Sequence, residues 1–161
     1  MSCDFFYTRI SLGKSGEPID VYKIRTMDPN CPPCDIERNH YGKLVVDQRV
    51  TKIGRILRKY WIDEIPQFWN LARGDMGIVG VRPMGEEMWR RYPEDIKNEA
   101  LRYRPGLFGF QYAFTEEGGF DKHVENMRRY LEESDKSPYL TDIKYFFCIL
   151  WNIIIRGVRS S

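Results

Sequence analysis

The chain has 161 residues, of which 42% are hydrophobic and 30% are charged, and its formal net charge is +2. This length and composition are those of one folded domain, so we expect a single domain over residues 1–161. The near-neutral charge argues against a nucleic-acid partner, although arginines gather locally along the chain.

The N-terminal part predicts a β-hairpin. Phe5 to Ile10 and Pro18 to Arg25 are rich in strand-forming residues, and a turn with two glycines from Gly13 to Gly16 separates them. Met27 to Asp47 contains three prolines and few apolar residues. We therefore expect irregular structure there.

Two cysteines in this irregular segment have the spacing of a metal-binding or redox motif. Cys31 and Cys34 flank two prolines, and His40 follows. One such pair supplies half of a tetrahedral zinc site, which Cys3 and His40 would complete. The alternative is a proline-rich loop with two thiols. Because the N-terminus lacks the pattern of a signal peptide, a reducing compartment is favoured over a disulfide scaffold.

Residues 50–74 predict two consecutive helices. Val50 to Tyr60 shows apolar residues at helical spacing, with basic residues between them. Asp63 is expected to be the N-cap of the second helix, since Pro66 falls in the first turn, where a missing N–H costs little. Gly74 is a natural helix stop. The apolar stripe of the second helix consists of Ile65, Phe68, Trp69 and Ala72.

The next part of the chain predicts one short strand and further helices. Met76 to Val81 is an apolar run that we expect to be extended, and Gly85 to Tyr103 predicts a helix interrupted near Pro93. The aromatic segment Leu107 to Phe114 is ambiguous. A charged helix is expected from Phe120 to Glu133.

Tyr139 to Arg156 predicts a last helix that is unusually apolar. From Tyr145 to Ile155 the polar interruption is Asn152. The run is far shorter than the roughly 20 apolar residues that cross a bilayer. Its aromatic and flanking basic residues suit a helix lying in a membrane interface. A buried core helix or a contact with a second copy of the chain is the alternative.

Asp63 and Glu64 are the most informative residues for chemistry. At a helix N-terminus the free N–H groups and the dipole favour negative charge, so we expect Asp63 to stay ionised at neutral pH. Such a carboxylate can attack phosphorus or bind a metal. Two adjacent carboxylates also fit one Mg²⁺ ion that bridges to a nucleotide diphosphate, because magnesium combines few protein carboxylates with phosphate oxygens. An ordinary helix cap is the simpler interpretation of the pair.

Several arginines are candidates for phosphate binding. A guanidinium group binds phosphate in bidentate fashion, and phosphoryl transfer depends mainly on positioning and charge stabilisation. Where a proline follows, the arginine backbone is restricted to extended conformations, which aims the side chain. The candidates are Arg25, Arg58, Arg82 and Arg104.

A series of motifs runs in order along the chain. It consists of Lys23-Ile24-Arg25-Thr26-Met27, Arg58, Asp63-Glu64-Ile65-Pro66-Gln67, Asn70-Leu71-Ala72-Arg73-Gly74-Asp75-Met76, Val79-Gly80-Val81-Arg82-Pro83 and Arg104-Pro105-Gly106. Together with the hairpin, the series resembles the bacterial sugar transferase family, the monotopic phosphoglycosyl transferases that begin polyprenol-linked glycan assembly. The resemblance extends from about Phe5 to Ile155, nearly the whole chain.

The resemblance implies a reaction and a fold. Asp63 would attack the β-phosphate of a UDP-sugar and release UMP, and a polyprenol phosphate would then take the phosphosugar. Glu64 would support Mg²⁺, and the four arginines would hold phosphates. The implied fold class is α+β, a compact and mostly helical domain with a small N-terminal antiparallel β-hairpin and amphipathic membrane-surface helices.

The resemblance also implies a setting. The expected place is the cytoplasmic face of the bacterial inner membrane, peripheral or monotopic, at the first membrane step of capsule, exopolysaccharide, O-antigen or glycoprotein assembly. The expected partners are a UDP-sugar, a polyprenol phosphate and the membrane surface, with a homo-oligomer left open. The alternative function is a non-catalytic binding or regulatory module with the same fold.

Three features depart from the family pattern. The family carries an apolar re-entrant membrane helix before the hairpin, whereas this sequence begins almost at the hairpin, which implies a truncation or a naturally short member. Val81 stands where the family usually has proline, so the loop presenting Arg82 is expected to be less rigid. Leu107 to Phe114 is more aromatic than the usual continuation, which implies an altered sugar or lipid preference.

Overall fold

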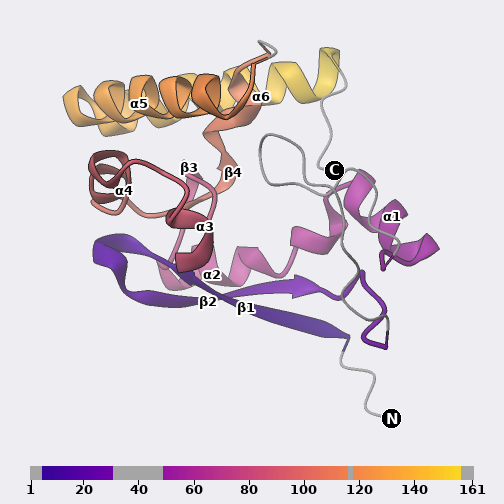
Figure 1. The fold of residues 1–161 in the computed structure, drawn as a ribbon. Coiled ribbons are helices and arrows are strands. Elements are labelled where there is room, and N and C mark those ends of the chain that lie inside the picture. Colours follow the sequence, from indigo (N-terminus) through magenta and orange to yellow (C-terminus); the bar gives the residue numbers. More distant parts are fainter. Residues whose placement is uncertain (1–4, 31–48, 116–117, 157–161) are drawn as a thin grey trace.

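The computed structural model describes residues 5–30, 49–115 and 118–156. In Figure 1 the N-terminal hairpin lies along one side of the molecule, the two long C-terminal helices lie along the opposite side, and the short central strands lie between them. Cys3, Cys31, Cys34 and His40 fall outside the described residues, so the choice between a zinc site and a plain loop stays open.

The predicted hairpin is confirmed. Strand β1 (Phe6–Leu12) pairs antiparallel with β2 (Pro18–Ile24), and a 3₁₀ turn, η1 (Lys14–Gly16), connects them. The hairpin is tied to the rest of the fold at its turn end, where the Leu12 N–H donates to Met84 O at 2.9 Å. This hydrogen bond holds the turn end of the hairpin against the segment that follows strand β3 (Gly77–Gly80).

Two helices follow, with a sharp turn between them. Helix α1 (Lys52–Lys59) is capped by Thr51, whose Oγ1 accepts a hydrogen bond from the Gly54 N–H at 2.9 Å. The second predicted helix is α2 (Gln67–Arg73), and Gly74 ends it in the left-handed conformation, φ 79°. Both helices and the glycine stop were expected from the sequence.

The predicted N-cap of the second helix is wrong. Asp63 lies inside a separate 3₁₀ turn, η2 (Ile62–Glu64), and Pro66 occupies the cap position of α2. The reason lies at Trp61, immediately before η2, which adopts a left-handed backbone with φ 62° and turns the chain before α2 begins. Asp63 is therefore not stabilised as a helix cap.

The side of α2 that faces inward is polar. Gln67 and Asn70 are buried, and the Asn70 amide donates to Asp20 O at 2.6 Å and accepts from the Tyr22 N–H at 3.3 Å. The amide thus fastens α2 to strand β2. All four residues of the apolar stripe are exposed: Ile65, Phe68, Trp69 and Ala72.

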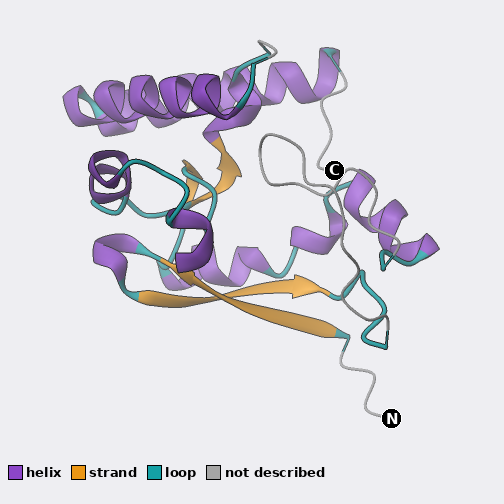
Figure 2. Cartoon of the chain, viewed as in Figure 1, coloured by secondary structure: helices purple, strands orange, loops and turns teal. Residues whose placement is uncertain are grey.

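The centre of the fold contains a second, parallel pair of strands (Figure 2). Strand β3 (Gly77–Gly80) pairs with β4 (Gly106–Gly109), and the connection between them carries α3 (Glu86–Trp89) and α4 (Glu94–Ala100). The extended run and the helix interrupted near Pro93 are thereby confirmed. The ambiguous aromatic segment forms most of β4 and a 3₁₀ helix, η3 (Phe110–Ala113).

Two long helices complete the domain. Helix α5 (Phe120–Lys136) and helix α6 (Pro138–Ile155) lie side by side (Figure 1), as the sequence predicts, although α5 is one turn longer than expected. They cover a core built from β3, η3 and the α3–α4 connection. Its buried residues include Val79, Val81, Trp89, Ile96, Phe110, Met127, Tyr130, Leu131, Tyr145 and Ile149.

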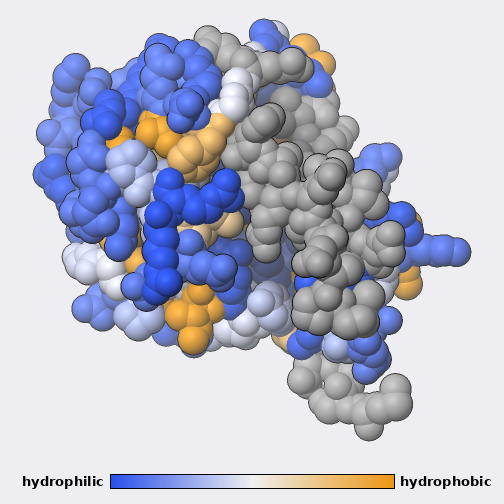
Figure 3. Space-filling view, in the orientation of Figure 1, coloured by the Kyte–Doolittle hydropathy of each residue, from blue (hydrophilic) through white to orange (hydrophobic). Residues whose placement is uncertain are grey.

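Helix α6 has one buried side, which is partly polar, and one exposed side, which is largely apolar. Thr141, Tyr145, Ile149 and Asn152 face the protein. Within the described part of the chain, no helix combines the length and apolarity that crossing a membrane requires. The exposed apolar face consists of Tyr139, Leu140, Ile143, Phe147, Leu150, Trp151, Ile154 and Ile155. By contrast, the coloured part of the face shown in Figure 3 is mostly hydrophilic, with small hydrophobic patches.

Candidate active site

The Asp63–Glu64 dyad lies in the buried turn η2, between the hairpin and α1. Each of the two residues is only 5% exposed. Burial of two adjacent carboxylates is unfavourable unless cations or hydrogen bonds compensate it. Two residues that the chain brings from distant positions supply that compensation.

Glu64 is held by two cations. Lys23, on β2, places its Nζ 2.8 Å from Glu64 Oε1, and Arg82, just after β3, pairs with the same oxygen through Nη2. The other terminal nitrogen of Arg82, Nη1, donates to the Tyr112 hydroxyl at 2.7 Å. The hairpin, the dyad turn and the central strands thus meet at one carboxylate.

Asp63 has a different environment from its neighbour. Burial raises the pKa of its carboxyl and so does the charge of Glu64, while the charges of Lys23 and Arg58 lower it; the net direction is upward. Its Oδ1 atom is buried and has no hydrogen-bond partner among the described residues. Asp63 therefore keeps one buried carboxyl oxygen that no described residue engages, beside the fixed carboxylate of Glu64.

The surroundings of the dyad are rich in positive charge. Arg58, on α1, donates from Nε to Thr26 Oγ1 at 2.9 Å, which holds it near enough to act on Asp63. Arg9, on β1, donates to Pro83 O at 2.6 Å, next to Arg82. Burial lowers the pKa of Lys23, and the charge of Arg82 lowers it further against the attraction of Glu64. An anionic ligand would relieve this crowding of cations.

The structure brings together some of the predicted site residues. Asp63, Glu64, Arg58 and Arg82 converge as described above. The guanidinium of Arg25 lies over the Tyr7 ring, 5.7 Å from its centroid, in the hairpin.

Arg104 lies at the other end of α2 from the dyad. Its Nη2 is 4.0 Å from the place where a Cβ on Gly74 would stand. Since Gly74 ends α2 and the dyad precedes it, the structure does not bring Arg104 to the carboxylates.

Lys23 and Tyr112 belong to the site but were not among the predicted site residues. Lys23 is part of the first motif in the series, so the sequence did contain a signal that could have identified it as a site residue. Tyr112 lies in the segment whose structure the sequence left ambiguous, and only the packing shows that its hydroxyl contacts Arg82.

The residues around the dyad set limits on metal binding. Within residues 5–30, 49–115 and 118–156, no group of three or more acidic, histidine or cysteine side chains is placed to hold an ion. The two dyad carboxylates nevertheless offer the hard oxygen donors that Mg²⁺ prefers, and Asp63 Oδ1 is unengaged by the described residues. They fit an ion whose other ligands come from a phosphorylated substrate.

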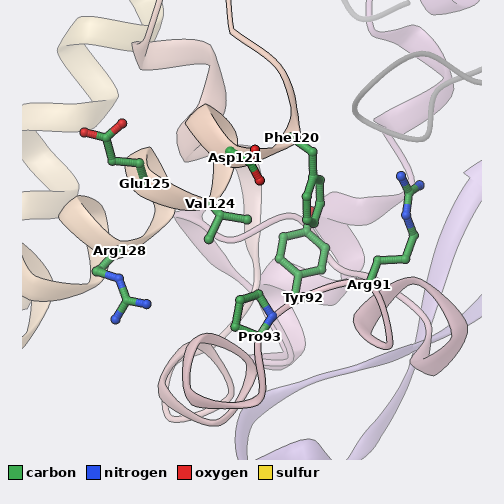
Figure 4. A pocket seen from close by; sticks show the side chains of 8 residues that line it. All are labelled: Arg91, Tyr92, Pro93, Phe120, Asp121, Val124, Glu125 and Arg128. Atoms are coloured by element: carbon green, nitrogen blue, oxygen red, sulfur yellow. The ribbon is translucent and has the colours of Figure 1, made fainter.

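A separate pocket lies between α5 and the α3–α4 loop (Figure 4). In that view the Tyr92 and Phe120 rings meet edge to face, with a centroid distance of 4.9 Å, and Arg91 flanks them. None of the predicted site residues lines this pocket. Its lining residues are Arg91, Tyr92, Pro93, Phe120, Asp121, Val124, Glu125 and Arg128.

Comparison with known proteins gives a consistent picture. The family described as "Bacterial sugar transferase" matches residues 2–156. The UDP-glucose:undecaprenyl-phosphate glucose-1-phosphate transferase of Caulobacter vibrioides is 41% identical over 127 residues, which cover 78% of this chain and 45% of that protein. The exopolysaccharide production protein ExoY of Sinorhizobium fredii is 37% identical over 140 residues, covering 75% of this chain and 62% of that protein.

A third relative is longer still. The undecaprenyl-phosphate galactose phosphotransferase of Salmonella typhimurium is 33% identical over 130 residues, which cover 73% of this chain and 27% of that protein. The chain thus spans about half the length, or less, of several curated relatives that it matches.

Proposed function

Since the chain belongs to the bacterial sugar transferase family, we propose that it transfers a sugar phosphate from a UDP-sugar to a polyprenol phosphate. The observation that carries this proposal is the buried dyad, in which Glu64 is fixed by two cations while Asp63 keeps an unengaged oxygen. The names of two relatives, which describe sugar-phosphate transfer involving undecaprenyl phosphate, support the same chemistry.

In the first step, a carboxylate oxygen of Asp63 attacks the β-phosphorus of the UDP-sugar. A new oxygen–phosphorus bond forms, and the bond from that phosphorus to the bridging oxygen breaks. UMP leaves with the electron pair of that bond, and the phosphosugar remains on Asp63 as an acyl phosphate. A phosphate oxygen of the polyprenol phosphate then attacks the same phosphorus and restores the free carboxylate.

The cations around the dyad stabilise the negative charge that is transferred to the leaving group during these steps. Arg82 and Lys23 pair with Glu64, and the charge of Arg58 lowers the pKa of Asp63. An incoming diphosphate would therefore meet a cluster of positively charged side chains. Phosphoryl transfer depends mainly on such positioning and charge stabilisation. Arg104 lies at the far end of α2 from the dyad. The phosphate-binding roles of Arg25 and Arg104 stay predictions.

Mg²⁺ is the cofactor that we propose. Asp63 and Glu64 would hold it, with the remaining ligands supplied by the diphosphate of the substrate, and it would neutralise negative charge on that diphosphate. Because Lys23 and Arg82 already share one oxygen of Glu64, the free protein is a poor cation site. We therefore expect the ion to bind together with the nucleotide.

We propose that the protein lies on the cytoplasmic face of the inner membrane, where its lipid acceptor would be reached. The exposed apolar face of α6 supports this proposal, as do Ile53, Ile56, Phe68 and Trp69, which are each more than half exposed near the dyad. Exposed apolar side chains in such numbers favour an interface with lipid or protein.

The direct test is UMP release with Mg²⁺, UDP-sugars and polyprenol phosphate in detergent. Asp63→Asn is expected to reduce release by at least about a thousandfold, because an amide is not a competent nucleophile. Asp121→Asn, an exposed change on α5, is the matched control and should retain activity. Chelation with EDTA should stop release by the wild type. Near-normal turnover of Asp63→Asn would refute the role of this residue.

A further inference from the structure

We propose that Tyr112 is a positioning residue that aims Arg82 at Glu64, and that helix α6 sets the place of Tyr112 through Asn152. The inference rests on the proposed function, since Glu64 belongs to the dyad. Tyr112 and Asn152 lie outside the motif series, and they connect the apolar C-terminal helix to the site.

The first step of the argument is the pair of contacts on one guanidinium group. Arg82 donates from Nη1 to the Tyr112 hydroxyl at 2.7 Å and pairs with Glu64 Oε1 through Nη2. A planar guanidinium held at both terminal nitrogens has little freedom to rotate. Tyr112 is only 5% exposed, so its hydroxyl is a fixed partner. The orientation of Arg82 toward Glu64 therefore depends on that hydroxyl.

The second step concerns the Tyr112 ring. Its centroid lies 4.8 Å from that of Trp61, in an edge-to-face arrangement. Trp61 immediately precedes the dyad turn and has the left-handed backbone that starts it, a conformation that persists only when surrounding packing supports it. Tyr112 is thus connected to the dyad indirectly in two ways, through Arg82, which pairs with Glu64, and through Trp61, which precedes the dyad turn.

The third step connects Tyr112 to α6. Asn152 is buried in an otherwise apolar stretch of that helix, and its amide nitrogen donates to Tyr112 O and Ala113 O, both at 3.0 Å. A buried amide is unfavourable unless it is hydrogen-bonded, so these contacts fix α6 against η3. A continuous chain of contacts runs from Asn152 through Tyr112 and Arg82 to Glu64.

The kinetic test uses Tyr112→Phe, which removes the hydroxyl and keeps the ring. Intact-mass measurement in a single turnover gives the rate constant and the final amount of phosphosugar adduct. We expect the rate constant to fall about tenfold, as for loss of a hydrogen bond to a charged group, with the final amount unchanged. In an Arg82→Lys background, the same change should have little further effect. Tyr130→Phe, which removes a buried hydroxyl bonded to Asp142, is the control.

A second measurement needs no substrate, so it tests the inference independently of activity. If the wild-type protein forms no phosphosugar adduct, that result refutes the proposed function, and the second measurement still tests the role of Tyr112. In ¹⁵N-arginine NMR spectra, the Arg82 Nε–H signal is assigned by its loss in Arg82→Lys. Tyr112→Phe should shift that signal, and Tyr130→Phe should not. Asn152→Leu and Asn152→Ser, which remove the amide with and without apolar bulk, should shift it too.

Several results would overturn the inference. One is an Arg82 NMR signal that does not shift in Tyr112→Phe, and another is a wild-type rate constant of adduct formation in that variant. A third is a reduced final amount of adduct at an unchanged rate constant, because that result indicates a purely structural role. An Arg82 signal unmoved by both Asn152 substitutions would remove α6 from the chain of contacts.

Discussion

Asp63 is a carboxyl group on which burial and neighbouring charge act in opposite directions. Burial, the largest effect, raises the pKa of Asp63, whereas the charges of Lys23 and Arg58 lower it, and the net shift is upward. A raised folded-state pKa means that the ionised form is less favourable in the folded protein than in the unfolded chain. The ionised group therefore weakens the fold at pH values above its pKa, and this penalty is relieved as the pH falls through that pKa. Reactivity at Asp63 is gained at the expense of stability.

The pH dependence of activity follows from the same balance. The nucleophile must be ionised, so UMP release should fall on the acid side as Asp63 becomes protonated. Lys23→Met removes an attraction that lowers the pKa of Asp63, so the acid limb of kcat/KM should move to higher pH. The measurement is the pH profile of UMP release, with Lys97→Met on α4 as the control. An acid limb that stays in place or moves to lower pH would contradict this electrostatic account.

At the scale of elements, the site depends on how closely α1 approaches the hairpin. Gly54 makes the approach possible, because a Cβ built there would lie 2.2 Å from Thr26 O, far inside contact distance. The same approach brings Arg58 to Thr26 Oγ1 and near Asp63. A single glycine thus controls whether the cation of α1 reaches the dyad.

Gly54→Ala should therefore displace α1. We expect it to lower the free energy of unfolding by about 1–3 kcal/mol, the usual effect of overpacking, and to reduce UMP release at the same time. Thermal unfolding and the UMP assay measure the two effects. Gly85→Ala is the control, since a Cβ there would lie at an ordinary 3.6 Å from its nearest neighbour, Ile10 O. Unchanged stability of Gly54→Ala would show that the close approach is unnecessary.

The elements that the sequence predicts well are those with local signals. Strand-forming runs on both sides of a turn predict the hairpin, Pro93 marks the break between α3 and α4, and Gly74 marks the end of α2. The error at Asp63 has a non-local cause. The turn at Trp61 is supported by packing on Tyr112, from a distant part of the chain, so no pattern near position 63 indicates it.

The candidate site was predictable from the sequence only where its residues carry local signals. Asp63, Glu64, Arg58 and Arg82 carry motif and charge signals, and the structure brings them together. Burial of Asn70 was not predictable, because an apolar stripe on the opposite side of α2 suggests the reverse orientation. The hairpin backbone and the Asp75 carboxylate, which both bond to the Asn70 amide, explain why the polar side faces inward.

At the scale of the whole molecule, apolar surface is exposed both on α6 and around the dyad. On α6 it includes Phe147 and Trp151, each more than 60% exposed. A buried core helix was one of the sequence-based alternatives, and α6 meets that description on one side only. The other side is free to lie against lipid, as we propose, or against a second copy of the chain.

Lipid binding by α6 can be tested with one charge. Phe147→Glu should weaken association with anionic phospholipid vesicles by about tenfold or more, because it loses apolar burial and adds repulsion. Vesicle sedimentation measures the change. Asn98→Glu on α4 introduces the same charge away from this face and should have little effect. Unchanged vesicle binding, with loss of self-association in solution, would assign the face to a homo-oligomer.

The most direct measurement of the central claim is the mass of the protein during the reaction. Wild-type chain mixed with UDP-sugars and Mg²⁺, without lipid acceptor, should gain one sugar phosphate, and peptide mapping should place it on Asp63. Addition of polyprenol phosphate should then remove it. Accumulation of polyprenol diphosphate sugar while Asp63 remains unmodified throughout would contradict the account.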